Sequence, residues 1–345
     1  MPIEFRCDEG KLVWVRNPFT GDITYFTHVH RKRSGFLRQA QQRLLAEAHV
    51  DRERYEAALR EDLERSRQEC PFCPGNEDRS PDEICRLTSE QVHGRPSDFP
   101  WLIRAVRNLV PRIPECCTGG QNESYVVVED PRHFADGARG HEDLIYSAML
   151  PPEQFEALLA VDRRVAEVAY RNPMVRKVLI RKNQGHESGA SQPHVHNQVI
   201  GSDRNFPAIE RECELTAREP AIWEEMIQFA RRFGFLLSDA GPCISYFCPF
   251  GTFPRSYDVV CLDHWERLTE VPERVWRLFA RTLHRVLQIL GPLPLDYEVH
   301  DGPGVPLHAH VNSRHYPYSN IGGTLNLPSV LLEATPAWEL PLSSA

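Results

Sequence analysis

The segment Gln192-Pro193-His194-Val195-His196-Asn197-Gln198 decides how this chain is interpreted. It follows the apolar β-branched run from Val175 to Ile180, so the sequence predicts a strand here. Side chains alternate between the faces of a strand, which puts His194, His196 and Gln198 on one face. Two imidazoles and an amide are poor core material. These residue types suit metal binding, attack on phosphorus and hydrogen bonding to a phosphoryl oxygen. The alternative interpretation is a polar face of the strand whose histidines are hydrogen-bonded within the protein and have no chemical role.

The composition bounds the class of protein. The chain has 345 residues, 41% of them apolar, which is enough for one large domain or two ordinary ones. A formal net charge of −8 argues against a broad nucleic-acid surface, although the basic cluster Arg31-Lys32-Arg33 suits a nucleotide. We find no run of transmembrane length and no signal-peptide core, and therefore predict a cytoplasmic protein without a membrane partner, whose ten cysteines are reduced.

The segment Cys70-Pro71-Phe72-Cys73 forms a Cys-x₂-Cys knuckle followed by Pro74-Gly75. Two thiolates at this spacing can hold one tetrahedral metal ion, and zinc is the expected ion. A second Cys-x₂-Cys is missing from the sequence, so we expect histidines, His133 and His194, to complete a Cys₂His₂ site. Such a site has no open position, and its role would be structural. Two free cysteines or a redox dithiol are the alternatives.

A second His-x-His occurs late in the chain, in Leu307-His308-Ala309-His310. A strand, a helix and a strand with His-x-His occur once before about residue 205 and once after it, which indicates an internal duplication. The second copy has Asn312 where the first has Gln198, so the copies are not equivalent. Nitrogen ligands plus one carboxylate suit zinc or iron. The candidate ligands of this second metal site are Glu212, His300, His308 and His310.

The rest of the chain reads as an α+β protein. A hairpin is expected over Val13–Thr27, with its turn at Thr20-Gly21-Asp22. Charged helices are expected within Leu37–Arg67, and further helices at Pro152–Tyr170, 208–233 and 272–290. The other expected strands are Leu102–Val110, Tyr125–Glu129, 243–250, 256–262 and Leu307–Val311.

His196 remains available for chemistry once His194 is assigned to a metal. A neutral imidazole nitrogen can attack phosphorus at pH 7 if the other ring nitrogen carries the proton, and a backbone carbonyl commonly holds that proton. Gln198 lies two residues on and on the same face, where it could donate to the non-bridging oxygens as charge builds on them. The sequence has neither a P-loop nor a nucleophile elbow.

These segments together resemble the galactose-1-phosphate uridylyltransferase family, a branch of the histidine triad superfamily. The resemblance runs through most of the chain. It rests on Asn17-Pro18-Phe19-Thr20-Gly21, Cys70 to Asn76 with Ser80-Pro81-Asp82-Glu83-Ile84, Arg107 to Pro111, Gly189 to His194, and Leu307 to His310. It implies two tandem histidine-triad-like halves, residues 1–205 and 206–345, each a mostly antiparallel sheet with packed helices.

The resemblance also implies a ping-pong nucleotidyl transfer in a homodimer. His196 would attack the α-phosphorus of a nucleotide sugar, and the nucleotidyl-histidine would pass its nucleotide to a phosphorylated acceptor. Gln198 is carried over as the second catalytic residue. Zinc ligands are carried over to Cys70, Cys73, His133 and His194, and the second metal site to Glu212, His300, His308 and His310. The implied substrate-contacting residues are Arg31, Asn108, Asn183, Ser191 and Gln192.

The sequence departs from the family beside the nucleophile. Val195 and Asn197 replace the usual Pro and Gly, and Ile321 to Asn326 replaces the usual hexose segment. Nucleotidyl transfer is therefore better supported than galactose as acceptor or uridine as base. The alternatives are an ADP-sugar or dinucleotide phosphorylase, in which inorganic phosphate is the acceptor, and a zinc-stabilised binding module without turnover.

Overall fold

The computed structural model describes residues 3–8, 10–28, 52–138, 143–185, 188–251, 253, 255–314 and 329–332. Arg31 and the first part of the predicted Leu37–Arg67 helical region lie outside these residues. The second part of that region is helix α2, Arg52–Glu69, which leads directly into the Cys70 knuckle.

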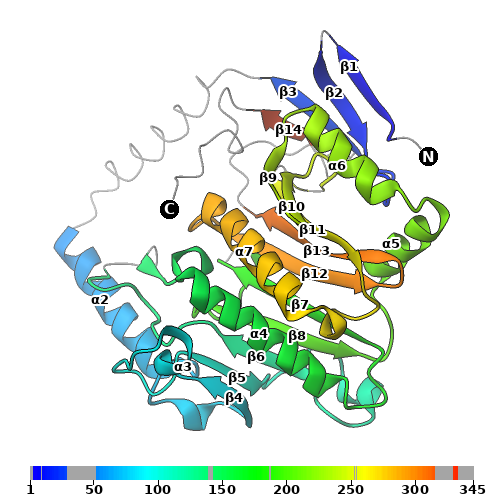
Figure 1. Ribbon diagram of the computed structural model, residues 1–345. Coiled ribbons are helices and arrows are strands. Elements are labelled where there is room, and N and C mark those ends of the chain that lie inside the picture. Colours follow the sequence, from blue (N-terminus) through cyan, green and yellow to red (C-terminus); the bar gives the residue numbers. More distant parts are fainter. Residues whose placement is uncertain are drawn as a thin grey trace.

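A ten-stranded sheet organises the described chain (Figure 1). Its strand order is β4-β5-β6-β8-β7-β12-β13-β11-β10-β9, and neighbouring strands pair antiparallel. The α+β class with a large antiparallel sheet is thus confirmed. The strands are β4 Glu83–Leu87, β5 Ile103–Arg107, β6 Ser124–Val128, β7 Lys177–Gln184, β8 His196–Ser202, β9 Leu236–Ala240, β10 Cys243–Phe247, β11 Ser256–His264, β12 Leu295–Gly302 and β13 Val305–Ser313.

The strand order is mirrored about the centre of the sheet. Strands β5, β6, helix α4 (Pro152–Ala169), β7 and β8 follow one another in the first half of the chain. Strands β10, β11, helix α7 (Glu273–Leu290), β12 and β13 repeat that succession in the second. The two sets meet where β7 pairs with β12, from Gln184 opposite Leu295 to Ile180 opposite Val299. One continuous sheet therefore crosses the predicted boundary at residue 205, and the division into two halves stays a prediction.

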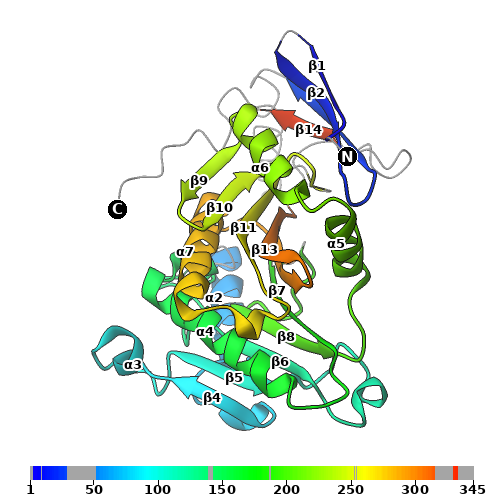
Figure 2. The same ribbon diagram turned by 45° about the vertical axis from the view of Figure 1, so that its right-hand side comes forward.

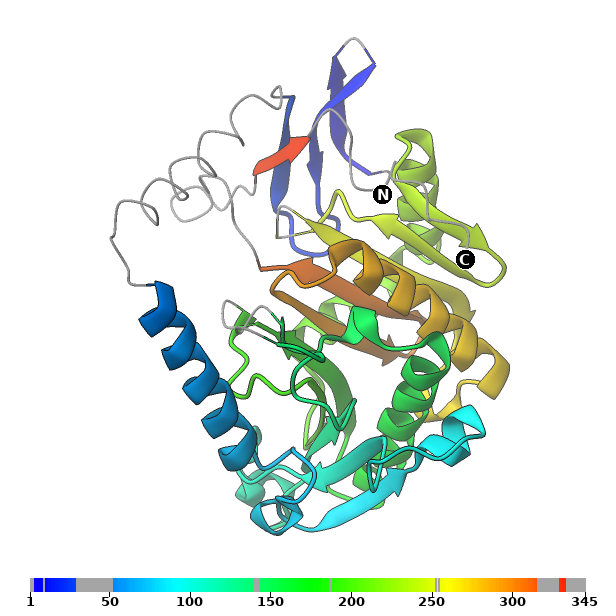
Figure 3. The same ribbon diagram turned by 90° about the vertical axis from the view of Figure 1, so that its left-hand side faces the viewer.

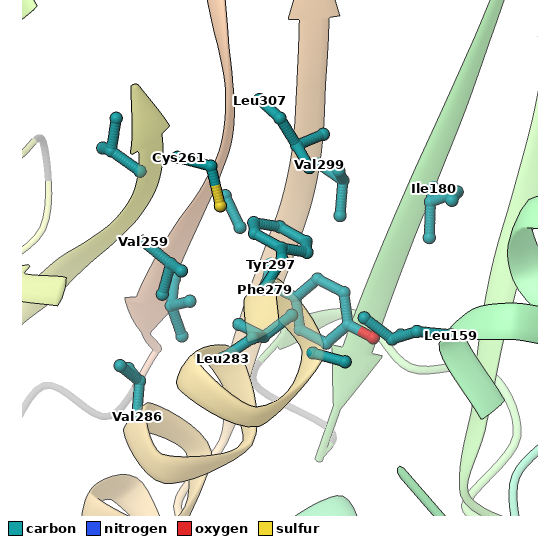
Figure 4. Close-up of a cluster of buried hydrophobic side chains, with 14 of the residues drawn as sticks. Leu159, Ile180, Val259, Cys261, Phe279, Leu283, Val286, Tyr297, Val299 and Leu307 are labelled. Carbon is teal, nitrogen blue, oxygen red and sulfur yellow. The ribbon is translucent and has the colours of Figure 1, made fainter. Parts of the chain in front are cut away.

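Helices α4 and α7 cover one face of the sheet, and Figure 3 shows α2 on the other side. Both covering helices are amphipathic and bury their apolar stripe. Figure 4 shows Phe279, Leu283 and Val286 of α7 facing Val259 and Tyr297 of the sheet. The indole Nε1–H of Trp276 donates to the carbonyl of Leu159 at 3.0 Å, which ties α7 to α4.

A second, four-stranded sheet lies beside the end of the large one (Figure 2). The predicted hairpin is present as β2 (Lys11–Arg16) and β3 (Ile23–His28), flanked by β1 (Phe5–Asp8) and β14 (Ser329–Leu332).

The expected helix at 208–233 is two helices, α5 (Pro207–Arg218) and α6 (Ile222–Arg232). Pro220 separates them because its ring leaves no N–H to donate and disfavours helical backbone at Glu219. The short helices are α3 Ser89–His93, η2 Glu77–Arg79, η3 Glu115–Thr118, η5 Ser147–Met149 and η7 Leu268–Glu270.

Two findings concern the predictions that the protein has no membrane-spanning segment and that its cysteines are reduced. Within the described ranges, every helix is too short or too polar to span a lipid bilayer. Cys243 and Cys261 form a disulfide, against the expectation that all ten cysteines are reduced. They sit directly opposite each other on the neighbouring strands β10 and β11, with Cα atoms 4.2 Å apart. That cross-strand placement, which spacing along the chain does not reveal, brings the two sulfurs together.

Candidate active site and metal clusters

His196 begins β8, a central strand that pairs with β6 on one side and β7 on the other. Its Nδ1–H donates to the carbonyl of His194 at 2.7 Å, so the lone pair of the ring lies on Nε2. The ring is only 4% exposed, and burial lowers the pKa of His196 to about 4, with a contribution from the nearby Lys182 ammonium. His196 is therefore neutral at pH 7, the state that a nitrogen nucleophile requires.

A cavity of about 350 Å³ lies in front of His196 and Gln198. Three of the predicted substrate-contacting residues, Asn108, Ser191 and Gln192, line it as well. Asn183 lies instead in a neighbouring cavity of about 570 Å³, which shares Ser191 and Gln192 with the first. Arg31 falls outside the described residues. The structure thus gathers these side chains around the nucleophile candidate, and their roles stay predictions.

Three arginines that the sequence analysis did not single out line the His196 cavity, and the described residues of its lining include no carboxylate. Arg79 donates to the carbonyl of Gln68 at 2.7 Å, and Arg107 to that of Asn122. Arg112 donates through Nε to the Gln198 amide oxygen at 3.4 Å. Within the part of the chain that the structure describes, none of the three has an acidic partner. The cavity is consequently electropositive and suits an anionic ligand.

The knuckle residues Cys70 and Cys73 meet His133 and His194 in one buried cluster. The distances from sulfur to Nδ1 are 3.5 Å for Cys70 to His194, 3.3 Å for Cys73 to His133 and 3.6 Å for Cys73 to His194. A tetrahedral ion with ordinary Zn–S and Zn–N bonds separates its sulfur and nitrogen ligands by about 3.6 Å. The three distances agree with that spacing, and all four ligand atoms lie within 4.8 Å of one another.

The surroundings of this cluster support metal binding. The Nε2–H of His194 donates to the carbonyl of Asp130 at 2.8 Å, which turns Nδ1 toward the sulfurs. The side-chain amide of Asn76 donates to the carbonyl of Cys70 at 2.8 Å and holds the knuckle closed. Hydrogen bonding from the Cys73 thiol, and then from the two histidines, outweighs burial and lowers the pKa of Cys70 strongly. A thiolate is the form of cysteine that binds a metal.

The second predicted set is also gathered into one cluster, in the other half of the sheet. His300 lies directly opposite His308 in the pairing of β12 with β13, and Glu212 reaches them from α5. Glu212 Oε2 lies 3.0 Å from Nδ1 of His300 and 3.5 Å from Nε2 of His308, and its Oε1 lies 3.2 Å from Nε2 of His310. One carboxylate and three imidazoles therefore converge at the edge of a cavity of about 230 Å³.

Two residues that the sequence analysis did not name orient this second cluster. Asp258 accepts from Nδ1 of His310 at 2.7 Å, and the carbonyl of Pro306 accepts from Nδ1 of His308 at 2.8 Å. Both bonds leave Nε2 facing Glu212, as in metal sites where a second partner fixes the ring. Burial alone would raise the pKa of Glu212, but His300 and His308 outweigh it and hold that pKa well below its usual range.

Comparisons with known proteins agree with this fold. The model of the family described as "Domain of unknown function (DUF4921)" matches residues 112–258. An ADP-glucose phosphorylase of Arabidopsis thaliana is 24% identical over 257 residues, which are 68% of this chain and 67% of that protein.

Solved structures give the same result. The crystal structure of an ADP-glucose phosphorylase from Arabidopsis thaliana with bound ADP-glucose has a TM-score of 0.61 at 15% identity, and covers 96% of this chain and 95% of its own. A uridylyltransferase structure has a TM-score of 0.54 at 19% identity, with 78% and 86% covered. The chain therefore has the fold of the galactose-1-phosphate uridylyltransferase type, and the resemblance indicated by the motifs is confirmed at the level of the fold.

Proposed function

We propose that the protein is a nucleotidyltransferase that moves a nucleoside monophosphate from a nucleotide sugar to a phosphate acceptor through a covalent nucleotidyl-His196. The observation that carries this proposal is the His196 ring. It is neutral, its Nδ1–H is engaged by the His194 carbonyl, and its free Nε2 belongs to a residue lining an electropositive cavity. A fixed, neutral imidazole in front of a phosphate-binding cavity is the arrangement that nucleophilic attack on phosphorus requires.

The reaction has two balanced steps. In the first, Nε2 of His196 forms a bond to the α-phosphorus, the bond from phosphorus to the bridging oxygen breaks, and sugar 1-phosphate leaves. In the second, an oxygen of the acceptor phosphate attacks the same phosphorus and the N–P bond breaks, which returns neutral His196. Gln198 is proposed to donate to the non-bridging oxygens in both steps. Asn108, Asn183, Ser191 and Gln192 are proposed to hold the substrate.

We propose inorganic phosphate as the acceptor and an ADP-sugar as the donor, the phosphorylase form of this chemistry. Two considerations support this choice over hexose 1-phosphate and a uridine nucleotide. The curated relative found by sequence is named an ADP-glucose phosphorylase. The segment Ile321 to Asn326 also differs from the usual hexose segment of the uridylyltransferases.

The metal clusters are proposed to have a supporting role. Cys70, Cys73, His133 and His194 would hold a zinc ion that stabilises the loop before β8 and fixes the direction of that strand. Glu212, His300, His308 and His310 would hold a second zinc or iron ion. Neither cluster includes His196, so both proposed steps use side chains outside the two metal clusters. We further propose a cytoplasmic homodimer, as the family resemblance implies.

The decisive experiment is intact mass measurement after incubation with ADP-glucose or UDP-glucose in the absence of acceptor. We expect an AMP adduct that disappears, with formation of ADP, when inorganic phosphate is added. The variant His196→Ala should form no adduct while keeping its fold and its metal, and a loss of several powers of ten in rate is expected for a removed nucleophile. Wild-type protein that binds nucleotide sugars without an adduct or turnover would instead identify a zinc-stabilised binding module.

A further inference from the structure

Gln198 is the only amide of the His-x-His-x-Gln segment on the nucleophile's face, and its partner in the structure is Arg112. The Nε of Arg112 lies 3.4 Å from Oε1 of Gln198, 86 residues away in the chain. The contact is long for a hydrogen bond, but the charge on the guanidinium keeps it attractive at this distance. Hydrogen bonds between catalytic groups are often long in proteins without substrate and become shorter when substrate binds.

This contact determines which way the amide of Gln198 faces. A guanidinium carries only donors, so the amide atom next to it must be the oxygen, and the NH₂ group must lie on the other side. Among the described residues, the Gln198 side chain has no other hydrogen-bond partner. Without Arg112 the amide could turn over, because the terminal torsion of Gln is broad and nearly two-fold. Its oxygen would then face the phosphoryl oxygens and repel them.

Arg112 is itself well placed to act as an anchor. It stands in Pro111-Arg112-Ile113-Pro114, where the prolines restrict the backbone on both sides. The side chain is exposed at the rim of the His196 cavity, so its charge is not committed to a buried ion pair. Arg79 and Arg107, which also line the cavity, donate to backbone carbonyls, and among the described residues neither has a hydrogen bond to Gln198.

We propose that Arg112 is a positioning residue for nucleotidyl transfer: it fixes the Gln198 amide with its NH₂ toward the phosphoryl oxygens and polarises that donor. This inference rests on the proposed function, since it concerns the same transfer to His196. A cation on the amide oxygen strengthens the N–H bonds of the same amide as donors. Arg112 thereby acts on the reacting phosphorus through Gln198 and not as a nucleophile or a proton carrier.

The test is the single-turnover rate of adduct formation from ADP-glucose in Arg112→Ala, Arg112→Lys, Gln198→Ala and the double variant Arg112→Ala/Gln198→Ala. We expect Arg112→Ala to slow the step about 100-fold, the usual loss when one oxyanion donor fails. Arg112→Lys should recover most of the rate. The double variant should be no more than about threefold slower than Gln198→Ala, because both changes remove one function. If the rate losses of the two single variants multiply in the double variant, or if the rate of Arg112→Ala is unchanged, the inference is overturned.

Further measurements separate positioning from a structural role. The dissociation constant for ADP-glucose, the melting temperature and the metal content should stay the same in Arg112→Ala. Free guanidinium should restore part of its rate and leave Gln198→Ala unaffected. Arg95→Ala, which changes an exposed arginine outside the cavity lining, is the matched control and should behave as wild type. Wild-type protein without an adduct overturns both proposals, whereas an adduct that forms equally fast in Arg112→Ala overturns only this one.

Discussion

Asn197 donates its side-chain amide to Asp162 at 2.7 Å, directly behind the strand that carries the nucleophile candidate. The same amide accepts from the Tyr297 hydroxyl at 2.9 Å. Asp162 lies on α4 and Tyr297 on β12, so one side chain of β8 joins a helix of the first half to a strand of the second. All three residues are fully buried. The Asn that departs from the family pattern therefore has a structural role on the face opposite His196.

We predict that Asn197→Gly, which restores the family residue, destabilises the protein by about 2–4 kcal/mol. The change leaves the Asp162 carboxyl and the Tyr297 hydroxyl buried without their partner, and it adds the cost of glycine within a strand. Urea unfolding measures the effect. The adduct on His196 should still form, because the side chain of Asn197 points away from the cavity.

The variant Tyr297→Phe is the matched control, since it removes one of the two hydrogen bonds and keeps the aromatic ring in the core. It should cost about 1–2 kcal/mol, clearly less than Asn197→Gly. Equal stability of Asn197→Gly and wild type would show that this network contributes nothing.

A second prediction concerns pH. Burial, with a contribution from Glu129, raises the pKa of Asp162 well above its usual range, although the bond from Asn197 opposes the shift. The folded protein therefore keeps this proton to higher pH than the unfolded chain, in which Asp titrates near about 3.9. The resulting stability is complete below that pH and is lost as the pH rises through the folded pKa.

We accordingly expect Asp162→Asn to flatten the pH dependence. Between about pH 5 and 8 the free energy of unfolding of wild type should fall relative to that of Asp162→Asn, which cannot ionise. Urea titrations across this interval measure the difference between the two proteins, so that other titrating groups cancel. Asp98→Asn changes an exposed aspartate and should follow wild type. Parallel curves for wild type and Asp162→Asn would contradict the prediction.

The third prediction concerns the knuckle. Cys73→Ser should lower both the zinc content of the purified protein and its melting temperature, because it removes a proposed ligand whose sulfur lies 3.3 Å from His133 Nδ1 in the buried cluster. Elemental analysis and thermal unfolding of the purified protein test it. Cys85→Ser, at a half-buried free thiol of β4, is the control and should keep its zinc. Full zinc content in Cys73→Ser would remove the knuckle from the metal site.

The fourth prediction concerns the second cluster. Asp258→Ala should weaken metal binding there by about 10–100-fold, since it removes the acceptor that orients His310. His310→Ala, which removes a candidate ligand, should abolish that binding. Metal titration after chelation measures both, and the zinc proposed for the Cys70 knuckle provides the internal control. Unchanged affinity in both variants would show that Glu212 and its histidines form only an ion-pair network.

Sequence patterns predicted those parts of the molecule that are formed by residues close together in the chain. The alternation from His194 to Gln198 predicted the strand, and β8 begins at His196. The Cys-x₂-Cys spacing predicted a knuckle, and the structure adds the two histidines named for it. In both cases the sequence carries a period or a spacing that is typical of a particular local geometry.

Contacts between distant segments could not be predicted in this way. Arg112 and Gln198 meet only because the segment after β5 folds over β8, and no pattern in either segment indicates it. The buried pair of Lys182 and Glu129, behind the backbone carbonyl of His196, is equally invisible in the sequence. Such pairs depend on the strand order of the sheet, which periodicity along the chain does not determine.

The last prediction concerns the acceptor. Inorganic phosphate is a compact anion that guanidinium groups without acidic partners can bind directly, and Arg79 and Arg107 supply two such groups at the His196 cavity. A hexose 1-phosphate needs, in addition, hydrogen-bonding groups matched to its hydroxyls, and a site built for other groups rejects it strongly. We therefore expect inorganic phosphate to discharge the nucleotidyl-histidine quickly and galactose 1-phosphate to do so slowly.

Pre-formed adduct mixed with each acceptor measures this preference directly, because it separates the second step from donor binding. We expect the second-order rate constant for inorganic phosphate to exceed that for galactose 1-phosphate by at least about 100-fold, and glucose 1-phosphate, which the proposed reaction releases, to react efficiently. Sulfate, which matches phosphate in shape but cannot accept the nucleotide productively, should compete as an inhibitor. If galactose 1-phosphate reaches kcat/KM of about 10⁴ M⁻¹s⁻¹ or more with UDP-glucose as donor, an ordinary value for a native substrate, then the substitutions at Val195 and Asn197 are neutral and the protein is a uridylyltransferase of the usual specificity.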